Sequence, residues 1–268
     1  MKPALISIGL FCASLCGAQP ANLSGIAHAA FRVADLETTR AFYNKLGFEE
    51  FFAMKRGEQT TEAFLKINDH QFIELYPQTA PTQPIGLMHV CYEAGDIEAL
   101  HEEYVKRGIT ASAVSKAGAG NLLMAMREPE GQTIEFTQYM PGSRHFEDRG
   151  KHLGANRVAQ QMLGATSPAR DVSAIRSFYV EKLGFAEIDH GIPARLRLPG
   201  DSGQELDIAA GGAAGIQFGV ADLGGTAGTL ASLGLAAKAT PADHPTLLTV
   251  TDPDGVVISF VKAAGGGR

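Results

Sequence analysis

The first half of the chain repeats a histidine and a glutamate at identical spacing. His28 is followed 46 residues later by Glu74, and His89 is followed 46 residues later by Glu135. Equal spacing in two successive segments indicates an internal repeat, whose pseudo-symmetry brings both pairs together if their inner faces meet. Two imidazoles and two carboxylates suit a divalent ion such as Zn, Ni, Co, Mn or Fe(II). In an octahedral site these ligands leave two neighbouring positions for a chelating substrate.

Taken singly, each of these residues has an ordinary structural interpretation. A histidine in a strand is more often a packed core or edge residue than a ligand, and a glutamate in a strand usually faces water. Glu74 and Glu135, however, stand at matched positions between apolar neighbours, in IEL and IEF. A buried carboxylate requires a partner or a metal. The joint pattern therefore favours a metal site.

The histidines lie in segments that predict a strand followed by a helix. The segment IAHAAFRV is apolar and β-leaning, and period-2 alternation places His28 and Arg32 on one face. Asp35 then caps a helix that ends at Gly47. The segment around His89 repeats this plan, so both histidines are expected on matched strands.

The strand and helix plan occurs four times, with a period of about 60 residues. RDVSAIRSFY in the second half echoes ADLETTRAFY in the first, and VTDPDGVVISF echoes REPEGQTIEF. Three shorter strands complete each copy, which gives a β-α-β-β-β unit. We predict an α+β fold of four such units in two modules, at residues 24–139 and 158–262. A polar linker at 140–157 and a frayed tail at 263–268 complete the division.

The second module departs from the ligand pattern when RSFY is aligned with RAFY. The alignment gives these counterparts of His28, Glu74, His89 and Glu135: Gly164 or Ala165, Asp207, Phe218 and Ser259. Only Asp207 is ionisable. The second module is therefore predicted to be free of metal and to serve packing, specificity or assembly.

Other candidate side chains receive structural interpretations. His145 and His152 lie in the polar linker and are interpreted as solvated histidines. His70 precedes Glu74 by four residues and is expected at a turn. Cys91 shares the face of the nearby ligand histidine; it could lie near the metal, but a buried inert thiol is the favoured interpretation.

Composition limits the classes of partner. The chain has 268 residues, of which 45% are hydrophobic and 7% aromatic, which suffices for packed cores in two modules. Its net charge of −6 comes from interspersed charges without a basic run. This pattern argues against nucleic acid and anionic lipid surfaces as partners.

The first 18 residues have the pattern of a secretory signal peptide. Lys2 precedes an apolar run and then CGA, and the run is too short to span a bilayer. We therefore expect export to the periplasm or the medium. A buried N-terminal strand or helix is the alternative, and a lipid anchor at Cys16 is less favoured because a leucine precedes it. After cleavage only Cys91 remains, so no internal disulfide is possible.

Four motifs resemble those of the vicinal oxygen chelate superfamily: HAAFRVADLETTRAFYNKLGF, GLMHVCYEAGD, IELYP and EPEGQTIEF. This superfamily holds glyoxalase I, extradiol ring-cleavage dioxygenases, epimerases and antibiotic-resistance proteins. The resemblance covers almost all of residues 24–262 and implies cupped, mixed eight-stranded sheets that enclose a metal. It is closest to glyoxalase I, for which it implies the ligands His28, Glu74, His89 and Glu135 in that order. It also implies that Arg32 holds a substrate carboxylate, although an arginine there also suits a simple ion pair.

The resemblance implies an enzyme of the lyase or isomerase class. One divalent metal would hold two adjacent oxygens of a small substrate while Glu135 or Glu74 moves a proton between neighbouring carbons. An exported protein would meet little glutathione, which argues against the usual thiol. Two alternatives stay open, an Fe(II) extradiol-type dioxygenase and a binding or sequestering protein without turnover. The sequence predicts no membrane span and leaves open a monomer or a homodimer.

Overall fold

The computed structural model describes residues 23–241 and 246–263; the predicted signal segment lies outside these ranges. The elements of the first module are β1 (Leu23–Val33), α1 (Leu36–Lys45), β2 (Glu50–Arg56), β3 (Gln59–Lys66), β4 (Phe72–Pro77), β5 (Gly86–Ala94), α2 (Ile97–Lys106), β6 (Ser115–Lys116), β7 (Leu122–Arg127) and β8 (Thr133–Gln138). A short helix, α3 (Arg144–Glu147), follows. The second module comprises β9 (Gln161–Ala169), α4 (Val172–Ser177), the π-helical turn η1 (Phe178–Leu183), β10 (Ala186–Asp189), β11 (Ala194–Arg197), β12 (Glu205–Ala210), β13 (Gly215–Val220), α5 (Leu223–Ser232), β14 (Lys238–Thr240), β15 (Leu247–Thr251) and β16 (Val257–Lys262).

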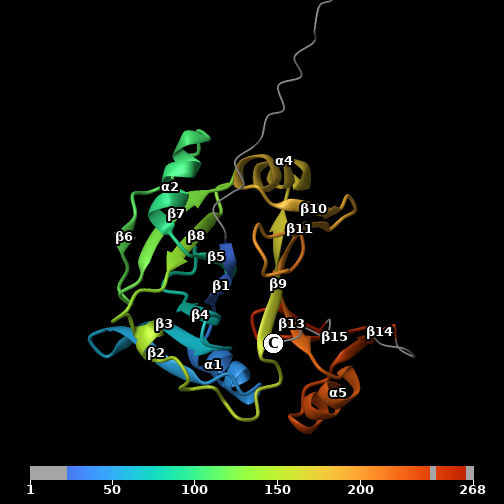
Figure 1. The fold of residues 1–268 in the computed structure, drawn as a ribbon. Helices are drawn as coiled ribbons and strands as arrows, with labels where there is room; N and C mark the ends of the chain where they lie inside the picture. The colour runs from blue at the N-terminus through green and yellow to red at the C-terminus, as the bar shows by residue number, and fades with distance from the viewer. Residues whose placement is uncertain (1–22, 242–245, 264–268) are drawn as a thin grey trace, which may run out of the picture.

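The strands form two mixed sheets of eight strands each, with the same topology. The first has the order β2-β3-β4-β1-β5-β8-β7-β6, and the second has the order β10-β11-β12-β9-β13-β16-β15-β14. Figure 1 shows the first sheet in blue to green and the second in yellow to red, with β1 and β9 near the line where the modules meet. The predicted α+β fold of four units in two tandem modules is confirmed.

The first strand and helix form as the sequence predicts. Asp35 caps α1, because its carboxylate accepts a hydrogen bond from the Thr38 backbone N–H at 2.9 Å. Alternate residues of β1, including Phe31 and Val33, are buried in the main hydrophobic core together with Tyr43 of the helix. The other face of β1 is left to carry polar side chains.

The four central strands set the position of that polar face. Parallel pairing aligns Ala30 of β1 with Glu74 of β4, and antiparallel pairing aligns Ala30 with His89 of β5. Cys91 of β5 lies opposite His28 on one side and Glu135 of β8 on the other. The register therefore brings the four predicted ligands to one region of a single sheet face.

Two equivalent turns join the modules reciprocally. In the first module, Glu130 accepts hydrogen bonds from the backbone N–H groups of Arg170 and Asp171, at the start of α4. In the second module, Asp254 accepts one from the Ala34 N–H at 2.7 Å and one from the Thr39 hydroxyl at 2.6 Å, around the start of α1. The similar turns EPEG and DPDG therefore make equivalent contacts, because each accepts hydrogen bonds at the start of a helix in the other module.

A pair of equivalent glutamines adds a second bridge. Gln71 donates to the carbonyls of Ile26 and Met162, which belong to different modules, and it accepts from the Met162 N–H. Gln204 donates to the same Met162 carbonyl and accepts from the Ile26 N–H at 2.6 Å. Gly25, beside the Gln204 side chain, has a φ of +153°, a backbone conformation that favours glycine.

Replacing Asp254 by alanine should lower the free energy of unfolding by about 1–2 kcal/mol, because two donors at the α1 terminus lose their acceptor. Urea denaturation would measure this loss. The exposed Asp201→Ala variant is the control and should unfold like the wild type. Equal stability of both variants would show that the reciprocal turn contact contributes nothing.

Within the described ranges, no helix has the length and apolar character needed to cross a bilayer.

Candidate metal centre

The four side chains predicted as ligands converge on one point of the first module. His28 Nε2 lies 3.1 Å from His89 Nε2, and His28 Nδ1 lies 3.3 Å from Glu74 Oε1. Glu135 Oε2 lies 3.4 Å from His89 Nε2 and 4.0 Å from His28 Nε2. The second Glu74 oxygen is 3.8 Å from His89 Nε2. Among the described residues these donors belong to two overlapping groups that could each hold a metal ion, His28 with Glu74 and His89, and His28 with Cys91 and Glu135.

These separations fit a shared divalent ion. Metal–ligand bonds of about 2.0–2.2 Å place neighbouring donors about 3 Å apart and opposed donors about 4 Å apart. His28, Glu74 and His89 are all buried and each offers one ligand atom within 4.8 Å of the others. Without a cation, two imidazoles and two carboxyl groups would be buried with little compensation. The donor set and its burial suit a metal, as the sequence predicts.

Burial also perturbs the acid–base behaviour of all four groups. It lowers the pKa of His89 to about 4 and places the pKa of His28 well below its usual value. It raises the pKa of Glu135 to about 7, and it raises the pKa of Glu74 well above the usual range. The metal-free site therefore favours neutral imidazoles and protonated carboxyl groups, so protons must leave before the carboxylates bind a metal.

Metal should stabilise this protein more strongly as the pH rises. In the metal-free protein the pKa of Glu135 in the folded state exceeds its unfolded value, so its contribution to stability is lost as pH rises through about 7. A bound cation compensates that buried charge. We expect the increase in Tm on adding excess Mn²⁺ to be larger at pH about 8 than at pH about 5.5, measured by differential scanning fluorimetry. A gain that is larger in acid would contradict this linkage.

A cavity of about 270 Å³ opens beside the four ligands. Its wall includes His28, Glu74 and Glu135, and the Glu135 side chain is 19% exposed whereas that of Glu74 is 5% exposed. Glu135 is therefore the carboxylate with more access to a bound molecule. Phe64 and Tyr139 contribute aromatic surface to the same wall.

Glu62 and Tyr76 are polar residues of this wall that the sequence analysis missed. The Tyr76 hydroxyl lies 2.5 Å from Glu62 Oε1 and 3.3 Å from Glu74 Oε2. Burial raises the pKa of Glu62 and of Glu74. Tyr76 follows Glu74 by two residues, so strand alternation signals its position, and Glu62 likewise alternates with Phe64 along β3.

The interpretation of His145 as a solvated linker histidine is wrong. Its side chain is buried and lines the cavity, because α3 packs against the first module. The fully buried Lys66 ammonium anchors this segment through the Asp148 carboxylate and backbone carbonyl, at 2.8 and 2.6 Å. His152 is nearly half exposed and pairs with the other Asp148 oxygen at 2.6 Å.

Five aromatic rings surround the His145 imidazole. It stacks on Tyr139 at 5.2 Å and meets four phenylalanine rings edge-on at 4.6–5.6 Å, from Phe51, Phe52, Phe64 and Phe72. Asn121 Nδ2 lies 2.8 Å from Nδ1, while its Oδ1 accepts from the Met140 N–H. The amide thus donates to Nδ1, which leaves the proton on Nε2. Burial lowers the pKa of His145 to about 3, so the ring is neutral near pH 7.

His145→Ala should lower the free energy of unfolding by about 2–4 kcal/mol, since it empties an aromatic cage. His145→Phe should cost less because it refills the volume. Neither variant should lose metal, because the imidazole is not among the converging ligand atoms. Urea denaturation and elemental analysis provide the two measurements, and loss of metal from the phenylalanine variant would contradict this assignment.

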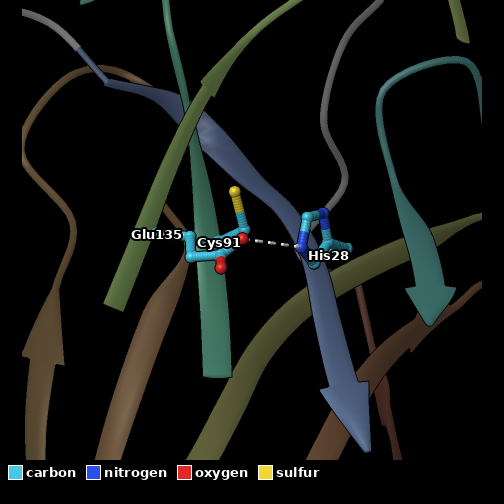
Figure 2. A group of neighbouring side chains, drawn as sticks. All are labelled: His28, Cys91 and Glu135. Atoms are coloured by element: carbon cyan, nitrogen blue, oxygen red, sulfur yellow. Dashed lines mark ion pairs between the residues drawn. The ribbon is translucent and has the colours of Figure 1, made fainter. Parts of the chain in front are cut away.

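Arg32 and Cys91 lie near the ligands but differ from them. The Arg32 guanidinium donates to the Pro84 carbonyl at 3.1 Å and does not line the cavity, so its contact with a substrate carboxylate stays a prediction. Cys91 is a free, fully buried cysteine. Figure 2 shows it beside His28 and Glu135, and burial raises the pKa of its thiol. The raised pKa agrees with an inert thiol, while its Sγ also lies within 4.8 Å of ligand atoms of His28 and Glu135, so the role of Cys91 stays a prediction.

His70 lies at the turn before β4, as predicted. Its exposed ring pairs with Glu93 at 3.0 Å.

Strand register corrects one alignment in the second module. Thr166 pairs with Asp207 and with Gly215, just as Ala30 pairs with Glu74 and with His89. The counterpart of His89 is therefore Gly215, and that of His28 is Gly164. The predicted Phe218 is instead a core residue that contacts Phe48 and Phe260. β5 begins at Gly86, three residues before His89, whereas β13 begins at Gly215 itself, so an alignment that matches the two strand starts places Phe218 opposite His89.

Little space remains at this second location. The cavity there measures only about 10 Å³. A Cβ on Gly164 would lie 2.8 Å from the Glu205 carbonyl, and one on Gly215 would lie 3.0 Å from the Val257 carbonyl. Asp207 instead faces Arg195, whose Nε is 3.8 Å from its carboxylate. Close-packed backbone thus occupies the place that ligand side chains take in the first module.

The comparison with known families agrees with this geometry. Residues 25–136 match the Glyoxalase/Bleomycin resistance protein/Dioxygenase superfamily. This match covers the first module, which holds the ligand cluster. The matched superfamily is the vicinal oxygen chelate superfamily that the sequence motifs resemble. None of the curated proteins matches the chain in sequence.

Solved structures extend the likeness of fold to both modules. The 2,3-dioxygenase LapB from Pseudomonas sp. KL28 has a TM-score of 0.70 at 15% identity, covering 93% of this chain and 94% of that chain. The Mn(II)-bound glyoxalase from Novosphingobium aromaticivorans has a TM-score of 0.67 at 15% identity, with 90% and 82% covered. A variant of homoprotocatechuate 2,3-dioxygenase from B. fuscum has a TM-score of 0.66 at 17% identity, with 93% and 76% covered. These likenesses establish the two-module fold.

Proposed function

We propose that the protein is a divalent-metal enzyme of the glyoxalase type, which holds adjacent oxygens of a small substrate and moves a proton between neighbouring carbons. The observation that carries this proposal is the cluster of two histidines and two glutamates beside a cavity, whose wall includes three of them: His28, Glu74 and Glu135, with His89 next to them. A bound divalent ion supplies Lewis-acid stabilisation of negative charge on substrate oxygens.

The surroundings of the two glutamates suit them to different roles. Glu135 has the more exposed side chain and faces the cavity, so it is the group that takes and returns the substrate proton. Glu74 is held by Tyr76 and by His28 Nδ1, which fix the orientation of its carboxylate. We therefore assign proton transfer to Glu135 and anchoring to Glu74.

An Fe(II) extradiol-type dioxygenase is the second candidate. The observation that favours it is the aromatic lining of the cavity by Phe64, Tyr76 and Tyr139, which suits the flat ring of a catechol. A fourth protein ligand would crowd the positions that oxygen and a catechol must share, because Glu135 and Glu74 both point to the ligand cluster. This candidate therefore ranks second.

Two assays on the purified, metal-loaded protein separate these activities. Anaerobic conversion of the hemithioacetal of methylglyoxal with a small thiol supports the glyoxalase-type reaction. Oxygen consumption with catechol by the Fe(II)-loaded protein supports the dioxygenase. A metal-loaded protein that performs neither reaction would contradict both and favour a binding or sequestering role.

We also infer export, on the signal-like pattern of residues 1–18. Expression of the full chain followed by fractionation and mass measurement tests this. A mature protein that begins near residue 19 in the exported fraction is the expected result, and a full-length protein retained in the cytoplasm would overturn it.

A further inference from the structure

In the part of the chain that the structure describes, the wall of the metal-centre cavity carries acidic side chains but no lysine or arginine. Among the described residues that line it, Glu62, Glu74 and Glu135 contribute carboxyl groups, and none is lysine or arginine. Lys66 is fully buried and is held by Asp69 and Asp148 at 2.8 Å each. Its charge is therefore already compensated outside the cavity.

When a divalent ion is bound, the site has no excess positive charge that would attract an anionic tail of the substrate. Two ligand carboxylates, on Glu74 and Glu135, can neutralise one divalent ion. Glu62 then adds either a further negative charge or a neutral carboxyl group, and in neither form does it bind an anion. A carboxylate brought into this buried space would lose water without gaining a countercharge, which is costly.

The size and lining of the cavity further limit which ligands can fit. Its volume of about 270 Å³ lies below the range of about 300–1,000 Å³ typical of sites for drug-sized ligands. Met54, Phe64, Leu123 and Tyr139 give it apolar surface. A single ring or a short chain next to the chelating oxygens fits these walls, whereas a long tail with several charges does not.

We propose that this cavity selects small oxygen chelators that carry no negative charge beyond the chelating oxygens, and that it excludes carboxylated ones. The inference rests on the proposed function for the metal that holds the chelating oxygens. It adds the charge and size of the substrate, and it predicts that thiol adducts with free carboxylates, such as those of glutathione, are poor substrates.

Three probes with one chelating head test this selection. Benzohydroxamic acid, its 4-carboxy derivative and its 4-aminomethyl derivative are titrated into the Zn²⁺-loaded full-length protein by calorimetry. We expect the carboxylated probe to bind at least about tenfold more weakly than the uncharged one, a difference of about 1.4 kcal/mol. The cationic probe should bind at least as tightly as the uncharged one. Equal or tighter binding of the carboxylated probe overturns the inference.

A charge variant at the wall provides the matched control. Met54→Lys introduces an ammonium of similar length and should improve binding of the carboxylated probe relative to the uncharged one by about tenfold. Met54→Leu changes the same side chain without charge and should leave the ratio as in the wild type. An unchanged ratio in the lysine variant, with zinc content preserved by elemental analysis, overturns the inference.

If the proposed function is wrong, a different measurement shows it. If the wild type takes up no metal, the metal-centre proposal is lost. The same three probes are then compared on metal-free protein by ligand-observed NMR. A preference for the uncharged and cationic probes still supports the selection, whereas a preference for the carboxylated probe, or no binding of any probe, overturns it.

Discussion

Replacing His28 and His89 together by alanine is expected to leave the protein without stoichiometric metal. Each imidazole contributes a buried nitrogen to the cluster, and these nitrogens lie only 3.1 Å apart. Loss of even an outer partner of a metal ligand typically weakens affinity by about 10–100-fold, so loss of two direct ligands should exceed that range. Elemental analysis of protein purified after metal loading measures the result.

The single variants His89→Ala and Glu135→Gln should each lower bound metal as well. His70→Ala is the matched control, because this histidine is exposed at a turn and pairs with Glu93 away from the cluster. Asp207→Asn is a second control, since it removes the counterpart of Glu74 in the other module. Stoichiometric metal in the double histidine variant would disprove the proposed centre.

Glu135→Gln is expected to lower kcat for the proton-transfer reaction by about 10²–10⁴-fold, because glutamine cannot accept the substrate proton. The variant is isosteric, so packing around β8 should be kept. Steady-state kinetics on fully metal-loaded protein measure the effect, and metal content must be determined for each sample because Glu135 is also a proposed ligand.

Glu74→Gln separates the two roles. If Glu135 moves the proton and Glu74 anchors, the Glu74 variant should lose more of its metal affinity than of its turnover per bound metal. Asp207→Asn should leave turnover unchanged, as its side chain lies in the second module and faces Arg195. Full activity of metal-loaded Glu135→Gln would show that another group transfers the proton.

Two features of the fold were predictable from local patterns. The cap at Asp35 holds as expected, and Asp96 caps α2 in the same way, because an N-cap needs only a side-chain acceptor next to its own helix. The four-unit architecture was likewise predictable, since each unit repeats the same order of strand, helix and turn signals. The equal spacing of the histidine and glutamate pairs predicted that four side chains would lie near one another, and His28 and His89 each lie within 3.4 Å of a glutamate oxygen; their role as ligands stays a prediction.

His145 and Gly215 were mispredicted for physical reasons. His145 lies in a polar segment, and nothing local reveals that the buried Lys66 anchors this segment against the first module. The position of Gly215 depends on hydrogen-bond register between strands, and β13 begins at this residue whereas β5 begins three residues before His89. Both outcomes depend on contacts between residues far apart in the chain.

The sequence by itself therefore determined the repeated units and the four residues that face one another at the candidate metal centre. Strand periodicity and equal spacing are local properties of the sequence. Because the two units of the first module are related by pseudo-symmetry, these properties bring the four side chains close together. Only the tertiary structure decided what surrounds that centre: the aromatic cage of His145, the Glu62 and Tyr76 contacts, and a wall in which no described residue is lysine or arginine. A cavity wall is assembled from several strands and a connecting segment, so its charge and shape arise only when the chain is packed.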